Sequence, residues 1–129
     1  MKELSKKIAE MDYDGLMTDI VPAAEVRGGT IRKLATAGTL KRGTLLAKSS
    51  TDNALVILGT EAAGAETLIP DCILCDDTVV GTAADVKAAV YTAGCFDINK
   101  CAVAEGYTVT EADKDQLREY GIVFKAAAN

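Results

Sequence analysis

The chain has 129 residues, of which 49% are hydrophobic and 26% are charged, and its formal net charge is −5. This length fits one domain, and the composition is typical of a folded globular protein rather than of a disordered tail. No apolar run approaches the ~20 residues of a membrane-spanning helix, and acidic residues follow the N-terminal lysines where a signal peptide has its apolar core, so we expect neither a membrane protein nor a secreted one.

Charge is distributed unevenly along the chain. Residues 1–50 hold nine Lys and Arg against six Asp and Glu, a balance of +3, whereas residues 51–129 hold five against thirteen, a balance of −8. Six basic residues lie between Arg27 and Lys48 without an acidic one among them. Because no aromatic residues are interleaved and the whole chain is acidic, we expect this stretch to face solvent or protein, and we expect no direct contact with nucleic acid.

Residues 1–26 differ from the rest and are interpreted as an N-terminal arm. The first turns are compatible with a helix, but Gly15 and Pro22 prevent a long continuous one. An apolar cluster follows Gly15 and comprises Leu16, Met17, Ile20 and Val21. Two hypotheses fit this cluster equally: it packs against the protein's own core, or it belongs to an arm that orders on a partner.

From Gly28 onward, short apolar segments alternate with Gly, Asp, Asn and Thr, a pattern that favours strands and turns. The candidate strands are Thr30 to Leu34, Thr44 to Lys48, Ala54 to Leu58, Leu68 to Leu74, Val79 to Gly81 and Ala88 to Ala93. The segment from Thr82 to Tyr91 is ambiguous, because Thr82 and Asp85 resemble a helix-capping box whereas Val90 and Tyr91 suit a strand.

One helix is clearly indicated near the C-terminus. Thr110 is a suitable N-cap for the sequence EADKDQLREY, acids lie in its first turn, and Gly121 is a suitable terminator. Strand character returns from Ile122 to Lys125. The sequence therefore predicts a mainly β (α+β) fold, in which residues 27–129 form one β-rich domain with one short C-terminal helix.

The residues that most enzymes need are missing or scattered. The chain has no His, which removes the commonest general base and the usual partner of a Ser or Cys nucleophile. Asp76 and Asp77 adjoin but have no second catalytic element, and the glycines form neither a P-loop nor a dinucleotide-binding motif. We expect no enzyme activity, no cofactor and no small-molecule substrate.

Four cysteines leave three uses open. Cys72 and Cys75 form a CxxC pair, and Cys95 and Cys101 bring the number of thiols to that of a structural zinc site. The first pair lies inside an apolar run, and residues three apart in a strand point to opposite faces, which favours structural thiols over shared metal ligation. A cysteine-ligated metal-binding module and a disulfide or redox pair remain the alternatives.

Two blocks of sequence resemble the lambda-type bacteriophage head decoration protein family. They are ATAGTLKRGTLLAKSS at residues 35–50 and LCDDTVVGTAADVKAAVYTAGCFDINK at residues 74–100. The stretches that match in order are Arg42 to Ala47, Ile73 to Val79 and Ala88 to Asp97, followed by Thr110 to Ile122. The resemblance covers nearly the whole chain after Gly28. Cys95 departs from it, since an acidic or polar residue is common there, and the CILC cysteines are not a feature of the family.

The resemblance implies a β-clip-like fold, with a strand rather than a helix for KAAVYTAGCF. It also implies a homotrimer that binds the major capsid protein at threefold positions on the outer surface of the virion and reinforces the shell, after synthesis in the host cytoplasm. In the family, the arm is thought to order against the capsid protein by adding a strand to a sheet edge. The corresponding capsid-binding hypothesis names Leu16, Met17, Thr18, Asp19, Ile20 and Val21, with the four apolar residues as anchors.

Overall fold

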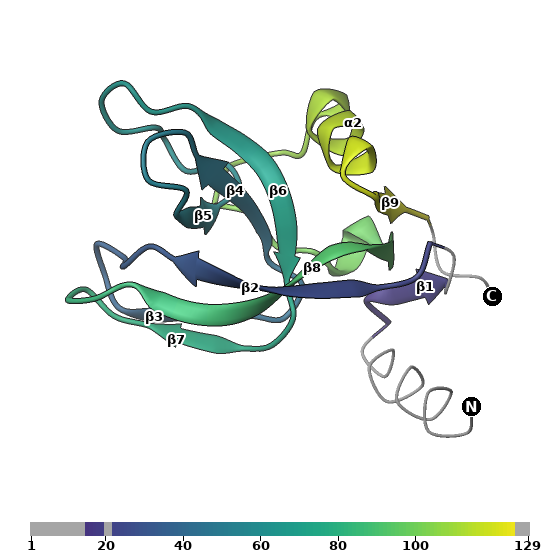
Figure 1. Cartoon of the computed structure of the whole chain (residues 1–129), viewed down its shortest axis with the longest axis horizontal. Coiled ribbons are helices and arrows are strands. Elements are labelled where there is room, and N and C mark those ends of the chain that lie inside the picture. The colour runs from purple at the N-terminus through teal and green to yellow at the C-terminus, as the bar shows by residue number, and fades with distance from the viewer. Residues whose placement is uncertain (1–14, 20–21, 126–129) are drawn as a thin grey trace.

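The computed structural model describes residues 15–19 and 22–125. Over these residues the fold is mainly β, with a helix near the C-terminus (Figure 1). Five strands pair in a closed ring in the order β8, β2, β5, β4, β6 and back to β8. They are β2 (Glu25–Ile31), β4 (Leu45–Ser49), β5 (Leu55–Ile57), β6 (Leu68–Leu74) and β8 (Val86–Phe96).

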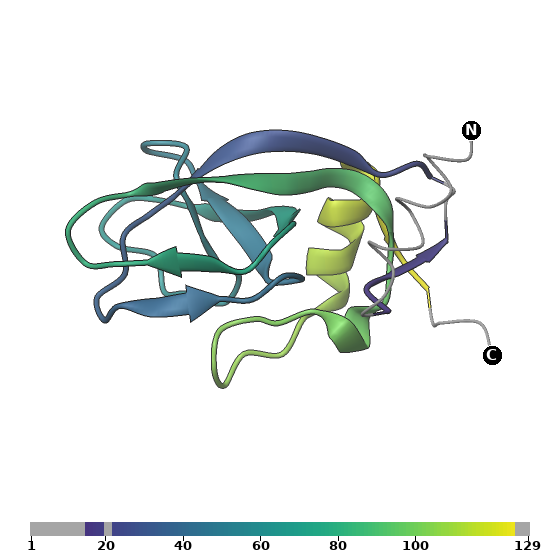
Figure 2. The ribbon, with the colours of Figure 1, turned by 90° about the horizontal axis from the view of Figure 1, so that it is seen from below.

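Four further strands, each of three residues, lie outside this ring. Strands β1 (Met17–Asp19) and β9 (Ile122–Phe124) both pair with the C-terminal end of β8, β1 antiparallel and β9 parallel. Strands β3 (Gly38–Leu40) and β7 (Thr78–Val80) form a separate antiparallel pair. The β3–β7 pair lies at the end of the molecule remote from β1 and β9, as the two perpendicular views show (Figures 1 and 2).

Two apolar clusters form the core, one on each face of the strands. Side chains of adjacent residues in a strand point to opposite faces, and in β4 Leu45 accordingly belongs to the first cluster and Leu46 to the second. The first cluster joins the ring to β1, β9 and the C-terminal helix. The second fills the space between the ring and the β3–β7 pair, where Leu40 and Val80 close it.

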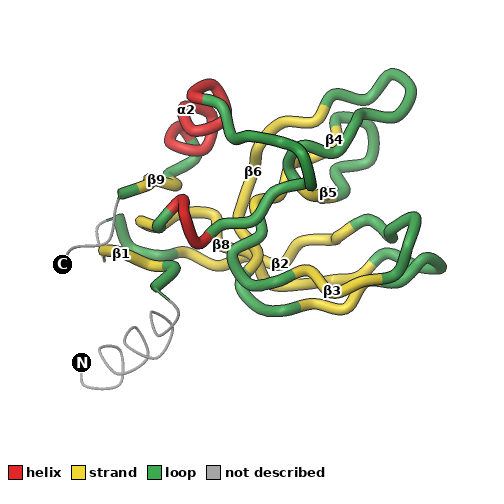
Figure 3. Tube along the Cα trace, turned by 180° about the vertical axis from the view of Figure 1, so that it is seen from behind, coloured by secondary structure: helices red, strands yellow, loops and turns green. Residues whose placement is uncertain are grey.

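The helix α2 (Glu111–Glu119) packs against β6 and β9 and can be followed in the tube view (Figure 3). It begins at Thr110, whose hydroxyl accepts a hydrogen bond from the Asp113 N–H, while the Asp113 carboxylate accepts one from the Thr110 N–H. Leu117 is fully buried. The helix ends before Gly121, whose φ of 103° requires a residue without a Cβ. The predicted helix, its cap and its terminator are confirmed.

The predicted strands are largely confirmed. Each of the six candidates overlaps a strand, and Leu68–Leu74 matches β6 at both ends. Residues from Val86 onward are strand, so the helical alternative for that segment is wrong there. The sequence analysis missed β1 and β3. Strand β2 begins at Glu25, so the predicted boundary between an arm at 1–26 and a domain at 27–129 falls inside a strand.

Replacing Thr110 with Ala removes the side-chain half of the capping box. We expect the free energy of unfolding to fall by about 1 kcal/mol, because the Asp113 N–H loses its acceptor. Urea denaturation measures the change. Thr108→Ala, at an exposed position two residues earlier, is the control and should alter stability by less than half as much; equal effects would contradict the assigned cap.

Candidate functional site

The residues of the capsid-binding hypothesis are divided by the structure. Leu16 and Met17 are 1% and 6% exposed and belong to the first core cluster, together with Phe96. For these two residues the structure therefore supports the first of the two hypotheses, packing against the protein's own core. Buried side chains are not available as anchors for a partner.

The next residues lie at the rim of the same edge. The Thr18 hydroxyl is 3.3 Å from the Cys95 thiol, and the Asp19 carboxylate pairs with the Lys125 ammonium at 3.5 Å. Ile20 and Val21 lie outside the described residues. Within the described part of the chain, the strand that pairs with β1 is β8. Of the predicted residues, Met17, Thr18 and Asp19 thus form one short strand at one end of the molecule (Figure 1).

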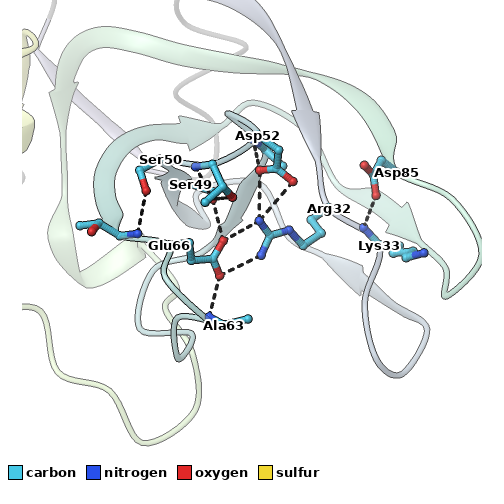
Figure 4. A network of polar contacts seen from close by, with 11 residues as sticks. Arg32, Lys33, Ser49, Ser50, Asp52, Ala63, Glu66 and Asp85 are labelled. Carbon is cyan, nitrogen blue, oxygen red and sulfur yellow. Dashed lines mark hydrogen bonds and ion pairs between the residues drawn. The ribbon is translucent and has the colours of Figure 1, made fainter.

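A buried carboxylate holds together three segments that are distant in sequence. Glu66, which is 8% exposed, accepts two hydrogen bonds from the Arg32 guanidinium at 2.8 and 3.2 Å (Figure 4). It also accepts hydrogen bonds from the Ser49 hydroxyl and from the Ala63 N–H, at 2.6 and 2.8 Å. The guanidinium extends the network to the exposed Asp52 carboxylate. The network fixes the loop between β5 and β6 against the ends of β2 and β4.

The same contacts set the protonation of the pair. The Arg32 guanidinium and then the Ala63 and Ser49 donors lower the pKa of Glu66 from 4.5 to about 2, because each stabilises the carboxylate. Reciprocally, the hydrogen bond to Glu66 raises the pKa of Arg32. The pair is therefore ionised at neutral pH.

The basic stretch between Arg27 and Lys48 does not form an uncompensated patch. Arg27 pairs with Asp71 at 2.8 Å, and Lys41 lies 3.7 Å from Asp77. The Arg42 guanidinium donates to the Cys75 carbonyl oxygen and to the Tyr91 hydroxyl, over whose ring it also lies. The acidic second half of the sequence thus supplies partners for Arg27 and Lys41.

The cysteines do not converge on one point. Cys72 belongs to the second core cluster and Cys75 to the first, so the CxxC pair is divided between the two faces of the strands, as predicted. Burial raises the pKa of the Cys72 thiol, raises that of Cys75 to about 11 and raises that of Cys101 to about 12. Among the described residues no group of three or more Cys, Asp or Glu side chains is arranged to hold a metal ion.

Three shallow hollows form a continuous row on the surface, because neighbouring hollows share lining residues. The first is lined in part by Ile69, Asp71 and Tyr120 and shares Lys48 and Asn53 with the second. The second, of about 240 Å³, shares the stretch 28–30 of β2 with the third. Such open hollows lack the enclosure that is typical of a small-molecule site.

Comparisons with known proteins leave the chain without an assigned family. No protein-family model matches the chain, and no curated protein matches it. Among the described residues, no helix has both the length and the apolar character needed to cross a bilayer.

The Glu66 network predicts how stability depends on pH. A folded-state pKa below the unfolded value means that the network stabilises the native state above about pH 4.5 and that this contribution disappears as the pH falls to about 2. We expect Glu66→Gln to unfold at lower urea concentration than the wild type at pH 7, and the difference to vanish near pH 2.

The control for that experiment is Glu61→Gln, an exposed carboxylate in the same loop. Its urea midpoint should follow the wild type across the pH range. A Glu66→Gln variant as stable as the wild type at pH 7 would show that the network does not stabilise the fold.

The buried thiols should be unreactive in the native protein. Burial shields them and raises the pKa of three of the four, so Ellman's reagent at pH 8 should label native protein far more slowly than protein unfolded in urea, where all four thiols are accessible. Rapid labelling of two or more native thiols would contradict this packing. A content of about one zinc per chain would instead favour the metal-binding alternative.

Proposed function

We propose that this chain is a non-enzymatic capsid decoration protein that binds the outer surface of an icosahedral phage head as a homotrimer and reinforces the shell. Its partners in this proposal are the major capsid protein and two further copies of itself, at the threefold positions of the virion. The proposal requires no cofactor, no substrate and no nucleic acid contact.

One observation carries the proposal beyond the sequence resemblance. The matching stretches, which lie far apart in the chain, belong to strands that pair with one another. Arg42 to Ala47 leads into β4, Ile73 to Val79 runs from β6 into β7, and Ala88 to Asp97 covers most of β8. β4 pairs with β6, and β6 pairs with β8. The resemblance therefore follows a contiguous part of the folded chain, which supports a common architecture rather than chance similarity of separate segments.

The mechanical demands of the role also suit this fold. A subunit that reinforces a shell under internal pressure needs cross-links between segments distant in sequence. Here β8 is hydrogen-bonded to four other strands, and the Arg32–Glu66 pair joins β2 to the β5–β6 loop. Among the described residues, no buried side-chain polar atom lacks a hydrogen-bond partner. These features resist local opening.

The capsid-facing surface in this proposal is the end of the molecule that carries β1. In this proposal, residues at this end add a strand to an exposed sheet edge of the capsid protein, a mode of recognition that depends on main-chain hydrogen bonds. Because Leu16 and Met17 are buried, the anchoring role passes to the residues that follow: Thr18 and Asp19 at the rim of β1, and Ile20 and Val21, which are outside the described residues.

Head binding tests the function directly. The substrate is heads that lack this protein, prepared from the phage whose genome encodes it, and the measurement is co-sedimentation at increasing protein concentration. We expect binding to saturate at one trimer per threefold position. Absence of saturable binding to such heads would overturn the proposed function.

A pair of substitutions tests the capsid-facing surface. Ile20→Asp combined with Val21→Asp should weaken head binding by about tenfold or more, equivalent to about 1.4 kcal/mol, because charge opposes burial at the contact. Val79→Asp is the matched control, because Val79 is 73% exposed on β7 at the other end of the molecule, and it should bind as the wild type does. Equal binding by all three proteins would place the contact elsewhere.

A further inference from the structure

Strand β2 has an open edge along most of its length. It pairs with β8 from Glu25 to Ile31, but its pairing with β5 is limited to Ile31 and Leu55, followed by one hydrogen bond from the Arg32 N–H to the Leu55 carbonyl oxygen. The edge from Glu25 to Thr30 that faces away from β8 therefore has no strand partner among the described residues. An unpaired strand edge is a template for another strand unless it is protected.

Two glycines of β2, Gly28 and Gly29, leave this edge without the side chains that would hinder the approach of another backbone. Gly29 is required by the core, since a Cβ there would lie 2.7 Å from the Leu55 Cδ1. Gly28 has no such reason among the described residues, because its φ is not positive and a Cβ there would meet nothing within 4 Å. Glycine inside a strand costs stability and often marks a place where another backbone approaches closely. Gly28 thus points to an approach from outside the subunit.

The two sides of this edge differ in chemistry. On the inner side runs the hollow that holds Lys48 and Asn53 beside the Arg27–Asp71 ion pair. Lys48 has no ion-pair partner within the described part of the chain, so this side carries one uncompensated positive charge. On the outer side, strand alternation places Val26, which is 57% exposed, next to Gly28 in the same row, and this row ends at Thr30, which pairs with the exposed Lys87. A strand that fits this edge needs acids beside Lys48 and apolar residues beside Val26.

The chain itself contains such a sequence. Residues 9–14 read AEMDYD, in which Glu10, Asp12 and Asp14 alternate with Ala9, Met11 and Tyr13. In an extended conformation the three acids lie on one side and the three apolar residues on the other. Fourteen residues precede Gly15, and a segment of that length reaches about 45 Å when extended, which is enough to contact a neighbouring subunit.

We propose that residues 9–14 of one copy add a strand to the open edge of β2 in a second copy. The acids face the hollow with Lys48 and Asn53, and Met11 and Tyr13 cover Val26 and Gly28. This contact joins different surfaces of two copies, as the closed ring of a trimer requires. The inference rests on the self-association proposed above and assigns a surface to it.

The first test reverses the charge of the segment in the full-length chain. Sedimentation velocity over a range of concentrations compares the wild type with Glu10→Lys, Asp12→Lys and Asp14→Lys combined. We expect self-association to weaken about tenfold or more, equivalent to about 1.4 kcal/mol. The control is Glu61→Lys, Asp76→Lys and Glu105→Lys combined, which changes net charge equally at exposed positions outside the hollows and should associate as the wild type does.

The second test separates a contact between copies from one within a single chain. Lys48→Glu combined with Asn53→Asp makes the hollow acidic, and this variant should also associate weakly, with an unfolding temperature that reports its integrity. When it is mixed with the Glu10→Lys, Asp12→Lys and Asp14→Lys variant, we expect stronger association than either component shows alone, since two of the three contacts in a mixed trimer then join oppositely charged surfaces.

Three results would overturn the inference: a wild type that remains monomeric throughout, equal association by wild type and segment variant, or a mixture that associates no better than its components. In the last two cases, an extended segment of the capsid protein becomes the candidate occupant of the edge. Head binding is measured independently. If any of these three results is obtained and the protein still binds heads saturably, the inference about residues 9–14 is wrong and the proposed function stands. If the protein does not bind heads saturably, the proposed function is wrong, even if the two variants associate when mixed.

Discussion

The pairing of β8 with its neighbours is the constraint on which the rest of the structure depends. Along its eleven residues β8 bonds to β2 and β6, and at its C-terminal end to β1 and β9. It also supplies Val90 to one core cluster and Tyr91 to the other. Any change that bends or shortens β8 therefore disturbs both clusters and the packing of α2 at once.

Ion pairs form a second set of contacts between distant segments. Several of them join basic residues of the first half of the sequence to acidic residues of the second half. Arg27, Arg32 and Lys41 from the first half each pair with an acid from the second. Most of these pairs are exposed and contribute little to stability. The Arg32–Glu66 pair differs, because Glu66 is buried and its carboxylate accepts hydrogen bonds from three segments: Arg32 after β2, Ser49 of β4 and Ala63 of its own loop. Loss of either partner would leave a charge with its desolvation uncompensated.

The sequence was sufficient for elements whose signals are local. The capping box at Thr110 and Asp113 and the glycine at 121 fixed the helix, and the apolar run bounded by turns fixed β6. The residues around Ala88 and Ala89 favour a helix locally, and their pairing with Gly28 and Gly29 overrides that preference. Strands β1 and β3 read MTD and GTL and hold one apolar residue each, so no apolar segment marks them, in contrast to LVI in β5.

The candidate sites were less accessible from sequence. Leu16 and Met17 suited a core or a partner equally, and only their packing against Phe96 decides between the two. A single buried glutamate has no sequence signature, and the charge imbalance between the halves was the sole indication that Glu66 would be paired. The open edge of β2 arises because its pairing with β5 is limited to Ile31 and Leu55. The β-propensities of the residues do not predict where such a pairing ends. The separation of Cys72 from Cys75 followed from strand geometry and was predicted.

The contact between β1 and β8 has a consequence for how the protein reaches its native state. Thr18 and Cys95 are 77 positions apart, and β2 pairs with β8 residues about 60 positions later. Until β8 has been synthesised, β1 therefore lacks the strand it pairs with, and the pairing of β2 is limited to its contact with β5. Non-local pairing of this kind slows folding and leaves apolar residues such as Leu16 exposed meanwhile. A nascent chain interrupted before residue 86 would lack the strand that joins its parts, and we expect it to be a target for chaperones and proteases rather than a partly active subunit.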